Sequence, residues 1–251
     1  MEIDELDNDN NLPLHKAVEQ GDVTLVQDLL QHGSKTDVLN NQFESPLHIA
    51  VKTGNADIIQ LLVQHGCDVN ICEDFGHATP LHFAVNAIND SELFHKILLT
   101  LLKGGCMLNW RAYSTLESPF YRAVDLQKSR IAAILLKYGS DPSLGSPFDL
   151  TALHKLCQQS NFYLINLVLH CKTNWKRETW LSDDLYSAYI LSLYDQDIVK
   201  TIKSWEFGVT SLKNMCRVKI RDILRDGLYC AVPYLPLPER LKGHLLLEDI
   251  F

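Results

Sequence analysis

Residues 45–50 read Ser-Pro-Leu-His-Ile-Ala, and this stretch decides the fold because it recurs along the chain. Two further copies keep the Pro-Leu-His core, and two later ones keep only part of it. These four stretches are Leu12–Ala17, Thr79–Ala84, Ser118–Ala123 and Thr151–Leu156. The second residues of successive copies lie 33, 34, 39 and 33 positions apart. A fixed period of this length indicates a stacked array of small, similar units.

Four glycines repeat in phase with the motif, so the periodicity rests on two independent markers. They are Gly33, Gly66, Gly105 and Gly139, spaced 33, 39 and 34 positions apart. Each ends a segment of paired aliphatic residues, which predicts a helix that stops at glycine. The motif proline predicts the start of an earlier helix, with residues such as Leu47 and Ala50 on its apolar edge. Each unit is therefore predicted to be a helix pair whose apolar faces are buried by stacking.

Motif and period together resemble the ankyrin repeat, whose signature is Thr-Pro-Leu-His-x-Ala at about 33 residues. The resemblance covers residues 11–171 and implies an all-α solenoid of about five to six helix pairs. An acidic tail at 1–10 precedes repeats that are expected at 11–44, 45–78, 79–117, 118–150 and 151–171. The third unit is longer, and residues 86–95 must either extend the helices or bulge out. Tyr121 and Ala152 replace the motif histidine and proline in the last two units.

Residues 172–210 lack the motif and are the least informative part of the chain. Two helices are predicted, at 185–194 and 198–205. They fit either a degenerate sixth repeat or a helical cap that closes the stack. Aromatic side chains are frequent here, and we expect most to be buried rather than to line a ligand pocket.

The C-terminal stretch 211–251 has a different pattern. Leu212, Cys216 and Ile220 are four residues apart and form one narrow apolar stripe on a predicted helix. By itself, this stripe is typical of a helix that packs on its own core. The segment Leu235-Pro236-Leu237-Pro238 then excludes helix and predicts an extended strip with both leucines exposed. A helical pattern resumes at 239–247.

This order of elements resembles the SOCS box, a small three-helix module. Leu212, Cys216 and Ile220 match its elongin C-binding motif, and the resemblance implies that Leu212 is the anchor. The four residues Leu235, Pro236, Leu237 and Pro238 match the motif that selects cullin-5. The resemblance therefore implies three partners: elongin B, elongin C, and cullin-5 with its RING protein.

Composition and charge narrow the class of protein. The seven cysteines are scattered, odd in number and without a Cys-x-x-Cys pair, so reduced thiols in the cytoplasm or nucleus are expected. No secretory signal or membrane span is predicted. Residues 211–251 carry seven basic and five acidic residues, and the rest carries 16 basic and 26 acidic residues. This acidic body disfavours nucleic acid, and it fits either a basic partner or simply a solvated surface.

A search for catalytic or metal-binding patterns points away from an enzyme. The histidines His15, His48, His82 and His154 belong to the repeat motif, where the ankyrin resemblance implies that they bond nearby backbone and tie repeats together. His32 and His65 precede helix-ending glycines and can bond last-turn carbonyls. No His-Glu-x-x-His motif, nucleophile elbow or phosphate-binding loop occurs. We expect no catalytic residue, metal or cofactor.

Binding remains as the expected activity, and the turns between repeats are where a protein substrate is expected. Large apolar and acidic residues lie at these turns, although the apolar ones could instead pack between repeats. The candidate substrate-binding residues are Phe43, Glu73, Asp74, Phe75, Trp110 and Tyr113. The resemblance implies a non-catalytic substrate receptor of a cullin-5 ubiquitin ligase. The alternative is an ankyrin scaffold whose C-terminal helices are only a cap.

Overall fold

The computed structural model describes residues 4–72, 78–144, 151–171, 195–207, 220, 224, 231–235, 237 and 239–246. Within these ranges every regular element is an α-helix or a short 3-10 helix. The all-α class predicted from the repeat period is thus confirmed for this part of the chain. Two compact units are present, Met1–Pro119 and Phe120–Phe251.

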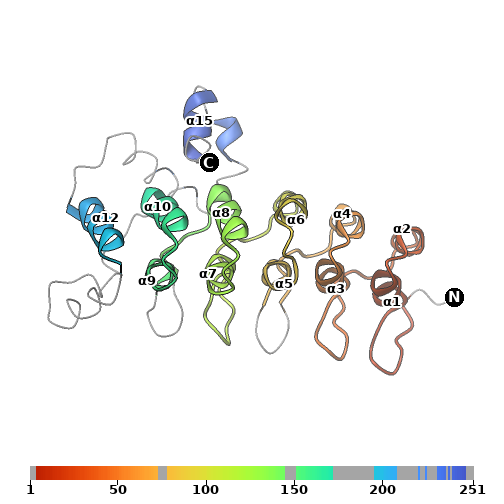
Figure 1. The fold of residues 1–251 in the computed structure, drawn as a ribbon. Coiled ribbons are helices and arrows are strands. Elements are labelled where there is room, and N and C mark those ends of the chain that lie inside the picture. Colours follow the sequence, from red (N-terminus) through yellow and green to blue (C-terminus); the bar gives the residue numbers. More distant parts are fainter. Residues whose placement is uncertain are drawn as a thin grey trace. The chain divides into compact units, whose positions relative to one another are not determined.

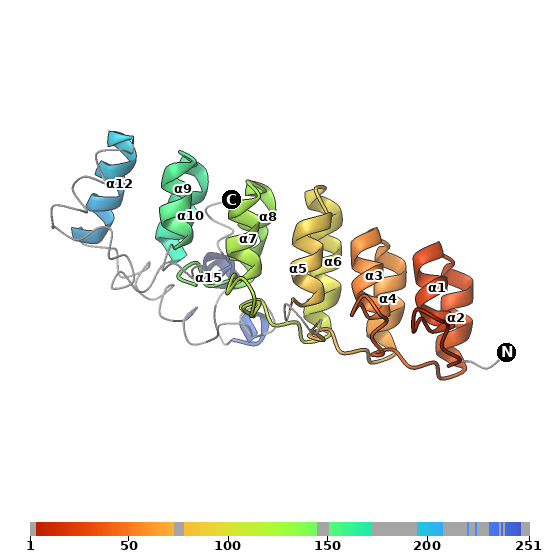
Figure 2. The same cartoon turned by 90° about the horizontal axis from the view of Figure 1, so that it is seen from below.

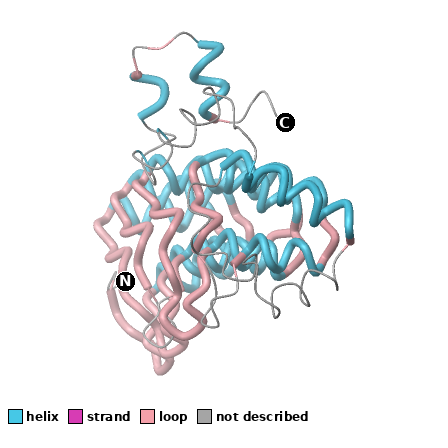
Figure 3. Tube along the Cα trace, turned by 90° about the vertical axis from the view of Figure 1, so that its left-hand side faces the viewer, coloured by secondary structure: helices cyan, strands magenta, loops and turns pink. Residues whose placement is uncertain are grey.

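Three helix pairs build the N-terminal unit. They are α1 (Pro13–Gln20) with α2 (Val23–Gln31), α3 (Pro46–Thr53) with α4 (Ala56–Gln64), and α5 (Pro80–Ala87) with α6 (Ser91–Lys103). In this unit α1, α3 and α5 form one row and α2, α4 and α6 a second (Figure 1). Each helix contacts its own partner and the equivalent helix of the next pair, so the pairs stack side by side (Figure 2). The long connections between successive pairs lie on one side of the two helix layers (Figure 3).

The first helix of each pair begins at the motif proline. Proline at this position has no N–H to lose and already has a helical φ angle. In α3, the Ser45 side chain also accepts a hydrogen bond from the His48 backbone N–H, which caps the helix. The first two of these helices end at Gly21 and Gly54, both with φ of +72°, a left-handed conformation that glycine adopts without strain.

The second helices begin at Asx caps and end at the in-phase glycines. Asp22, Asn55 and Asp90 each accept a hydrogen bond from a first-turn N–H. Their helices α2 and α4 have nine residues, whereas α6 has 13. Most of the extra length of the third unit therefore extends its second helix, and the turn before α6 is one residue longer. This outcome resolves the two alternatives left by the sequence.

The C-terminal unit holds the remaining helices. They are α7 (Pro119–Asp125), α8 (Ser129–Tyr138), α9 (Ala152–Gln158), α10 (Phe162–Cys171), α12 (Gln196–Phe207), the 3-10 helix η4 (Val232–Tyr234) and α15 (Glu239–Leu245). Helix α10 contacts α8, α9 and α12. The two pairs α7–α8 and α9–α10 are joined by polar bonds, since Gln159 Nε2 donates to Val124 O at 2.9 Å and Asn161 Nδ2 to Ser129 Oγ at 2.8 Å.

Of residues 172–210, only α12 lies within the described part, so the choice between a sixth repeat and a cap stays a prediction. No helix among the described residues combines the length and apolar character needed to cross a bilayer. In the same ranges no three His, Cys, Asp or Glu side chains gather as metal ligands would.

Candidate functional site

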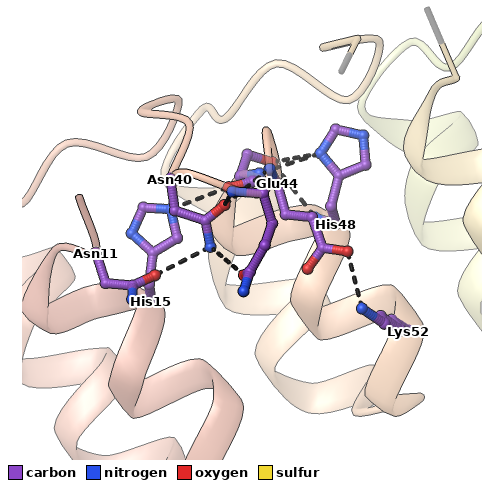
Figure 4. A network of polar contacts seen from close by, with 8 residues as sticks. Asn11, His15, Asn40, Glu44, His48 and Lys52 are labelled. Carbon is purple, nitrogen blue, oxygen red and sulfur yellow. Dashed lines mark hydrogen bonds and ion pairs between the residues drawn. The ribbon is translucent and has the colours of Figure 1, made fainter. Parts of the chain in front are cut away.

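Three motif histidines join each repeat of the N-terminal unit to the loop that follows it. The His15 Nδ1 atom accepts from the Leu12 backbone N–H at 3.1 Å, and its Nε2 lies 3.0 Å from Val38 O and 3.2 Å from Glu44 O. Because the backbone N–H can only donate, Nδ1 carries a lone pair and the proton lies on Nε2. Figure 4 shows this ring beside the loop that leads to α3.

The next two motif histidines repeat this arrangement. His48 Nε2 lies 3.3 Å from Ala78 O, and His82 Nε2 lies 3.3 Å from Glu117 O. Burial lowers the pKa of His15, and it lowers the pKa of His48 to about 4. Both rings are thus neutral near pH 7 and hold loops in place. The structural role implied by the ankyrin resemblance is confirmed for these three residues.

The histidines before the helix-ending glycines bond as expected. The Nδ1 atom of His32 lies 2.8 Å from Asp28 O, and that of His65 lies 2.9 Å from Leu61 O. Each ring therefore satisfies a carbonyl in the last turn of its helix. Cys67 lies nearby but is buried, and burial raises the pKa of its thiol to about 12, so it is an unreactive thiol at neutral pH.

A buried asparagine organises the first loop between repeats. Asn40 is only 4% exposed, and its Oδ1 accepts from the N–H groups of Gln42 at 2.9 Å and Glu44 at 3.0 Å. Its Nδ2 donates to Asn11 Oδ1 at 3.0 Å (Figure 4). The Glu44 carboxylate also pairs with Lys52 at 2.8 Å. These hydrogen bonds and the ion pair therefore hold the loop in one conformation.

The acidic N-terminal segment has the same turn. Asp7 Oδ1 accepts from the N–H groups of Asp9 at 2.9 Å and Asn11 at 2.8 Å, as Asn40 does one repeat later. Asp4 accepts from the Lys35 N–H at 3.2 Å, and the Asn41 N–H donates to Asp9 O at 2.9 Å. Residues 4–10 are thus bonded to the first loop and form the half-repeat that precedes α1.

Non-glycine residues adopt a left-handed conformation at the turns. Asn10, Phe43 and Leu116 each lie three residues before a motif proline, with φ of +57°, +59° and +52°. Asparagine tolerates this region, whereas phenylalanine and leucine are strained there by about 1–2 kcal/mol. Strain of this kind often marks a functional position. Two of the turns therefore hold large apolar residues in an unfavourable conformation.

The predicted substrate residues differ in exposure. Tyr113 is 73% exposed, whereas Phe43 and Trp110 are half-buried. Glu73, Asp74 and Phe75 lie outside the described residues. Two exposed apolar side chains in the Tyr113 loop were missed by sequence reasoning: Met107 at 44% and Leu116 at 37%. The repeat phase could have identified Leu116, because it occupies the same turn position as Phe43.

The C-terminal module has a small core of its own, and it corrects one prediction. Val232 and Leu245 are buried, and their packed neighbours are the partly buried side chains Ile220, Leu224, Leu235, Leu237 and Leu246. The expectation that Leu235 and Leu237 both stand exposed is therefore wrong. Extended backbone at Leu235 (φ −65°, ψ 139°) still agrees with the proline-rich pattern, but it turns the leucines toward Val232 and Leu245.

Only part of the two predicted partner motifs lies in the described chain. Ile220 of the first motif and Leu235 and Leu237 of the second all pack against the same apolar cluster. The other members are outside the described residues: Leu212, Cys216, Pro236 and Pro238.

Comparison of the sequence with known proteins identifies both the repeats and the C-terminal module. The family model for ankyrin repeats, in three copies, covers residues 14–112, and the SOCS box model covers residues 208–246. The chain carries the two domains after which the ankyrin repeat and SOCS box proteins are named. It is similar to ankyrin repeat and SOCS box protein 11 of Homo sapiens and of Pongo abelii, with 27% identity over 171 residues in each case. That alignment takes in 68% of this chain, and the chain spans about half the length of these curated relatives.

Two regions of the chain are the candidate binding surfaces. One is the set of loops between the repeats of the N-terminal unit. Residues 1–119 as a whole carry 17 acidic and six basic residues, which is a formal charge of −11. The other is the C-terminal module built on Val232 and Leu245. Both would bind a partner through shape complementarity, apolar contact and charge.

Proposed function

We propose that this chain is the substrate-recognition adaptor of a ubiquitin ligase built on elongin B, elongin C and cullin-5 with its RING protein. The single observation that carries the proposal is the presence, on one chain, of an ankyrin array and a SOCS box with both partner motifs. Leu212, Cys216 and Ile220 would hold elongin C. Leu235, Pro236, Leu237 and Pro238 would favour cullin-5 over other cullins.

The array would hold a protein substrate through the loops that carry Phe43, Trp110 and Tyr113, extended by Met107 and Leu116. The rigid loop around Asn40 supports this role, because a preorganised surface loses little entropy on binding. The adaptor breaks no bond itself. Holding substrate lysines beside the ubiquitin donor raises their effective concentration, and this proximity would be its contribution to rate.

We place this assembly in the cytoplasm or the nucleus, where the scattered cysteines would stay reduced. The proposal includes no cofactor, metal, nucleic acid or membrane.

The alternative of a scaffold with a helical cap has one observation in its favour. Leu235 and Leu237 pack on the module's own core, as residues of a purely structural cap would. The test must therefore separate folding from assembly.

Co-expression with elongin B and elongin C, followed by size-exclusion chromatography and addition of cullin-5, makes that separation. Wild type is compared with Leu212→Asp and with a variant in which residues 235–238 are all alanine. The adaptor is supported if wild type forms the complete assembly and Leu212→Asp loses elongins while its ankyrin unit keeps its helical circular dichroism signal. The second variant should retain elongins and lose cullin-5. If the soluble wild-type chain does not bind elongins, the adaptor is ruled out and the scaffold is the function.

A further inference from the structure

The motif leucines of the C-terminal module have part of their apolar surface already covered. Leu235 and Leu237 pack on Val232 and Leu245, both of which are at most 3% exposed. A partner that binds this region therefore meets leucines that are only partly available. Other side chains must supply the rest of the apolar contact area.

Two exposed apolar residues flank the motif on either side in sequence. Tyr234 directly precedes Leu235 and is 89% exposed, and Leu241, on α15 just after the motif, is 41% exposed. Within the described part of this module, they are the large apolar side chains that face solvent. Tyrosine combines a large apolar ring with a hydroxyl group and is a frequent anchor residue of protein interfaces.

A lysine holds the segments that carry these residues together. Lys242 Nζ donates to Pro233 O at 2.9 Å and to Glu239 Oε1 at 2.9 Å. The lysine side chain is only 17% exposed, and η4 and α15 contact each other. Tyr234 is adjacent to Pro233, and Leu241 is adjacent to Lys242. The hydrogen bond between Lys242 and Pro233 therefore joins the two segments next to both exposed residues, which are carried on one preorganised support.

We infer that Tyr234 and Leu241 contact the cullin directly, and that they extend the binding surface of the Leu235–Pro238 motif. This inference rests on the proposed function. The cullin is the occupant because both residues are continuous in sequence with the motif proposed to bind it. The matching cullin surface would be apolar with a polar group that bonds the tyrosine hydroxyl.

The test uses the full chain in complex with elongin B and elongin C, and it measures the dissociation constant for cullin-5 by biolayer interferometry. The variants are Tyr234→Ser and Leu241→Gln. Phe162→Ser and Leu6→Gln are the matched controls, because these residues are 48% and 50% exposed and lie outside the module. Each test variant should weaken cullin-5 binding by at least about tenfold, and the controls should stay within about twofold of wild type. Elongin binding and the thermal midpoint of the complex should not change.

Equal cullin affinity in wild type and both test variants would overturn the inference and leave the proposed function intact. Loss of elongin from Tyr234→Ser or Leu241→Gln would also overturn it, because these residues would then face elongin. If the wild-type complex itself does not bind cullin-5, the proposed function fails together with the inference. The wild-type measurement separates this last outcome from the other two.

Discussion

The Nε2 atom of His48 lies 3.3 Å from the carbonyl oxygen of Ala78, the residue before the cap of the third repeat. On its other side, the same ring accepts from the backbone N–H of Ser45 at 3.2 Å. One neutral imidazole therefore satisfies a helix start in its own repeat and a loop carbonyl in the next. Protonation of Nδ1 would break the first bond and place a charge in a buried site.

The stability of the N-terminal unit is expected to fall between pH 6.5 and about 4. Above pH 6.5 His48 is neutral in both the folded and the unfolded state. Below pH 6.5 His48 is protonated in the unfolded chain. In the folded chain it stays neutral until about pH 4, because burial lowers the pKa of His48 to that value. The free energy of unfolding then decreases by up to about 1.4 kcal/mol per pH unit for this group. Urea titrations at several pH values measure this decrease.

His48→Gln is the control for this pH dependence. It should be less stable than wild type at pH 7, and the difference should shrink as the pH falls. Carboxylates such as Asp7, whose pKa is lowered mainly by the hydrogen bond from Lys16, titrate in both proteins. Their contribution therefore cancels in the stability difference between wild type and His48→Gln. A difference that does not vary with pH would contradict the expected role of His48.

Gly104→Ala is expected to destabilise the N-terminal unit. A Cβ at this position would lie 2.7 Å from Val69 Cγ1 and 3.1 Å from Val63 Cγ1. Overpacking of this kind costs about 1–3 kcal/mol. Chemical denaturation of Gly104→Ala, Val69→Ala and the double variant gives the coupling energy. The double variant should recover part of the loss, and strict additivity would show that Val69 is not the obstacle.

Asn40→Ala should lower the free energy of unfolding by about 1–3 kcal/mol, because the N–H groups of Gln42 and Glu44 lose their buried acceptor. Asn41→Ala is the matched control on the exposed neighbour and should cost less than about 0.5 kcal/mol. Both values come from urea denaturation followed by circular dichroism. Equal losses in the two variants would argue against Asn40 as the organiser of the loop.

Leu116→Asn is expected to raise stability by up to about 1 kcal/mol, since asparagine tolerates the left-handed conformation that leucine does not. Tyr113→Asn in the same loop lacks this conformation and should change stability by less than about 0.5 kcal/mol. Thermal midpoints provide the comparison. A loss of stability in Leu116→Asn would show that the leucine packs more than its 37% exposure suggests.

Leu237→Ala should lower the thermal midpoint of the full chain, in contrast to an interface residue that acts only on binding. The side chain packs on Val232 and Leu245, and its partial burial corresponds to a loss of about 1–2 kcal/mol. Leu241→Ala, on the exposed side of the same module, should leave the midpoint within about 1 °C of wild type. If both variants melt alike, the small core described for this module is not what stabilises it.

Much of the fold could be predicted from the residues because the repeat imposes local rules. Proline marks the first residue of α3, and the in-phase Gly66 lies two residues after the end of α4. The histidine role was implied by the ankyrin resemblance, and it agrees with these local rules, since each ring accepts from the backbone N–H three residues earlier. The solvent exposure of individual side chains could not be predicted from the sequence, because it depends on which side chains from different segments pack into the same cluster. Leu235 and Leu237 illustrate this, because they are partly buried against Val232 and Leu245.

By itself, then, the sequence determined the helix pairs, their period and the order of the two modules, because these depend on contacts within a few residues. The tertiary structure alone decided that the extra residues of the third unit lengthen α6 and that residues 4–10 complete a half-repeat. It also decided that Tyr234 rather than Leu235 faces solvent. These features depend on packing between different segments of the chain, where hydrophobic burial and backbone hydrogen bonding select one arrangement among several that the local pattern allows.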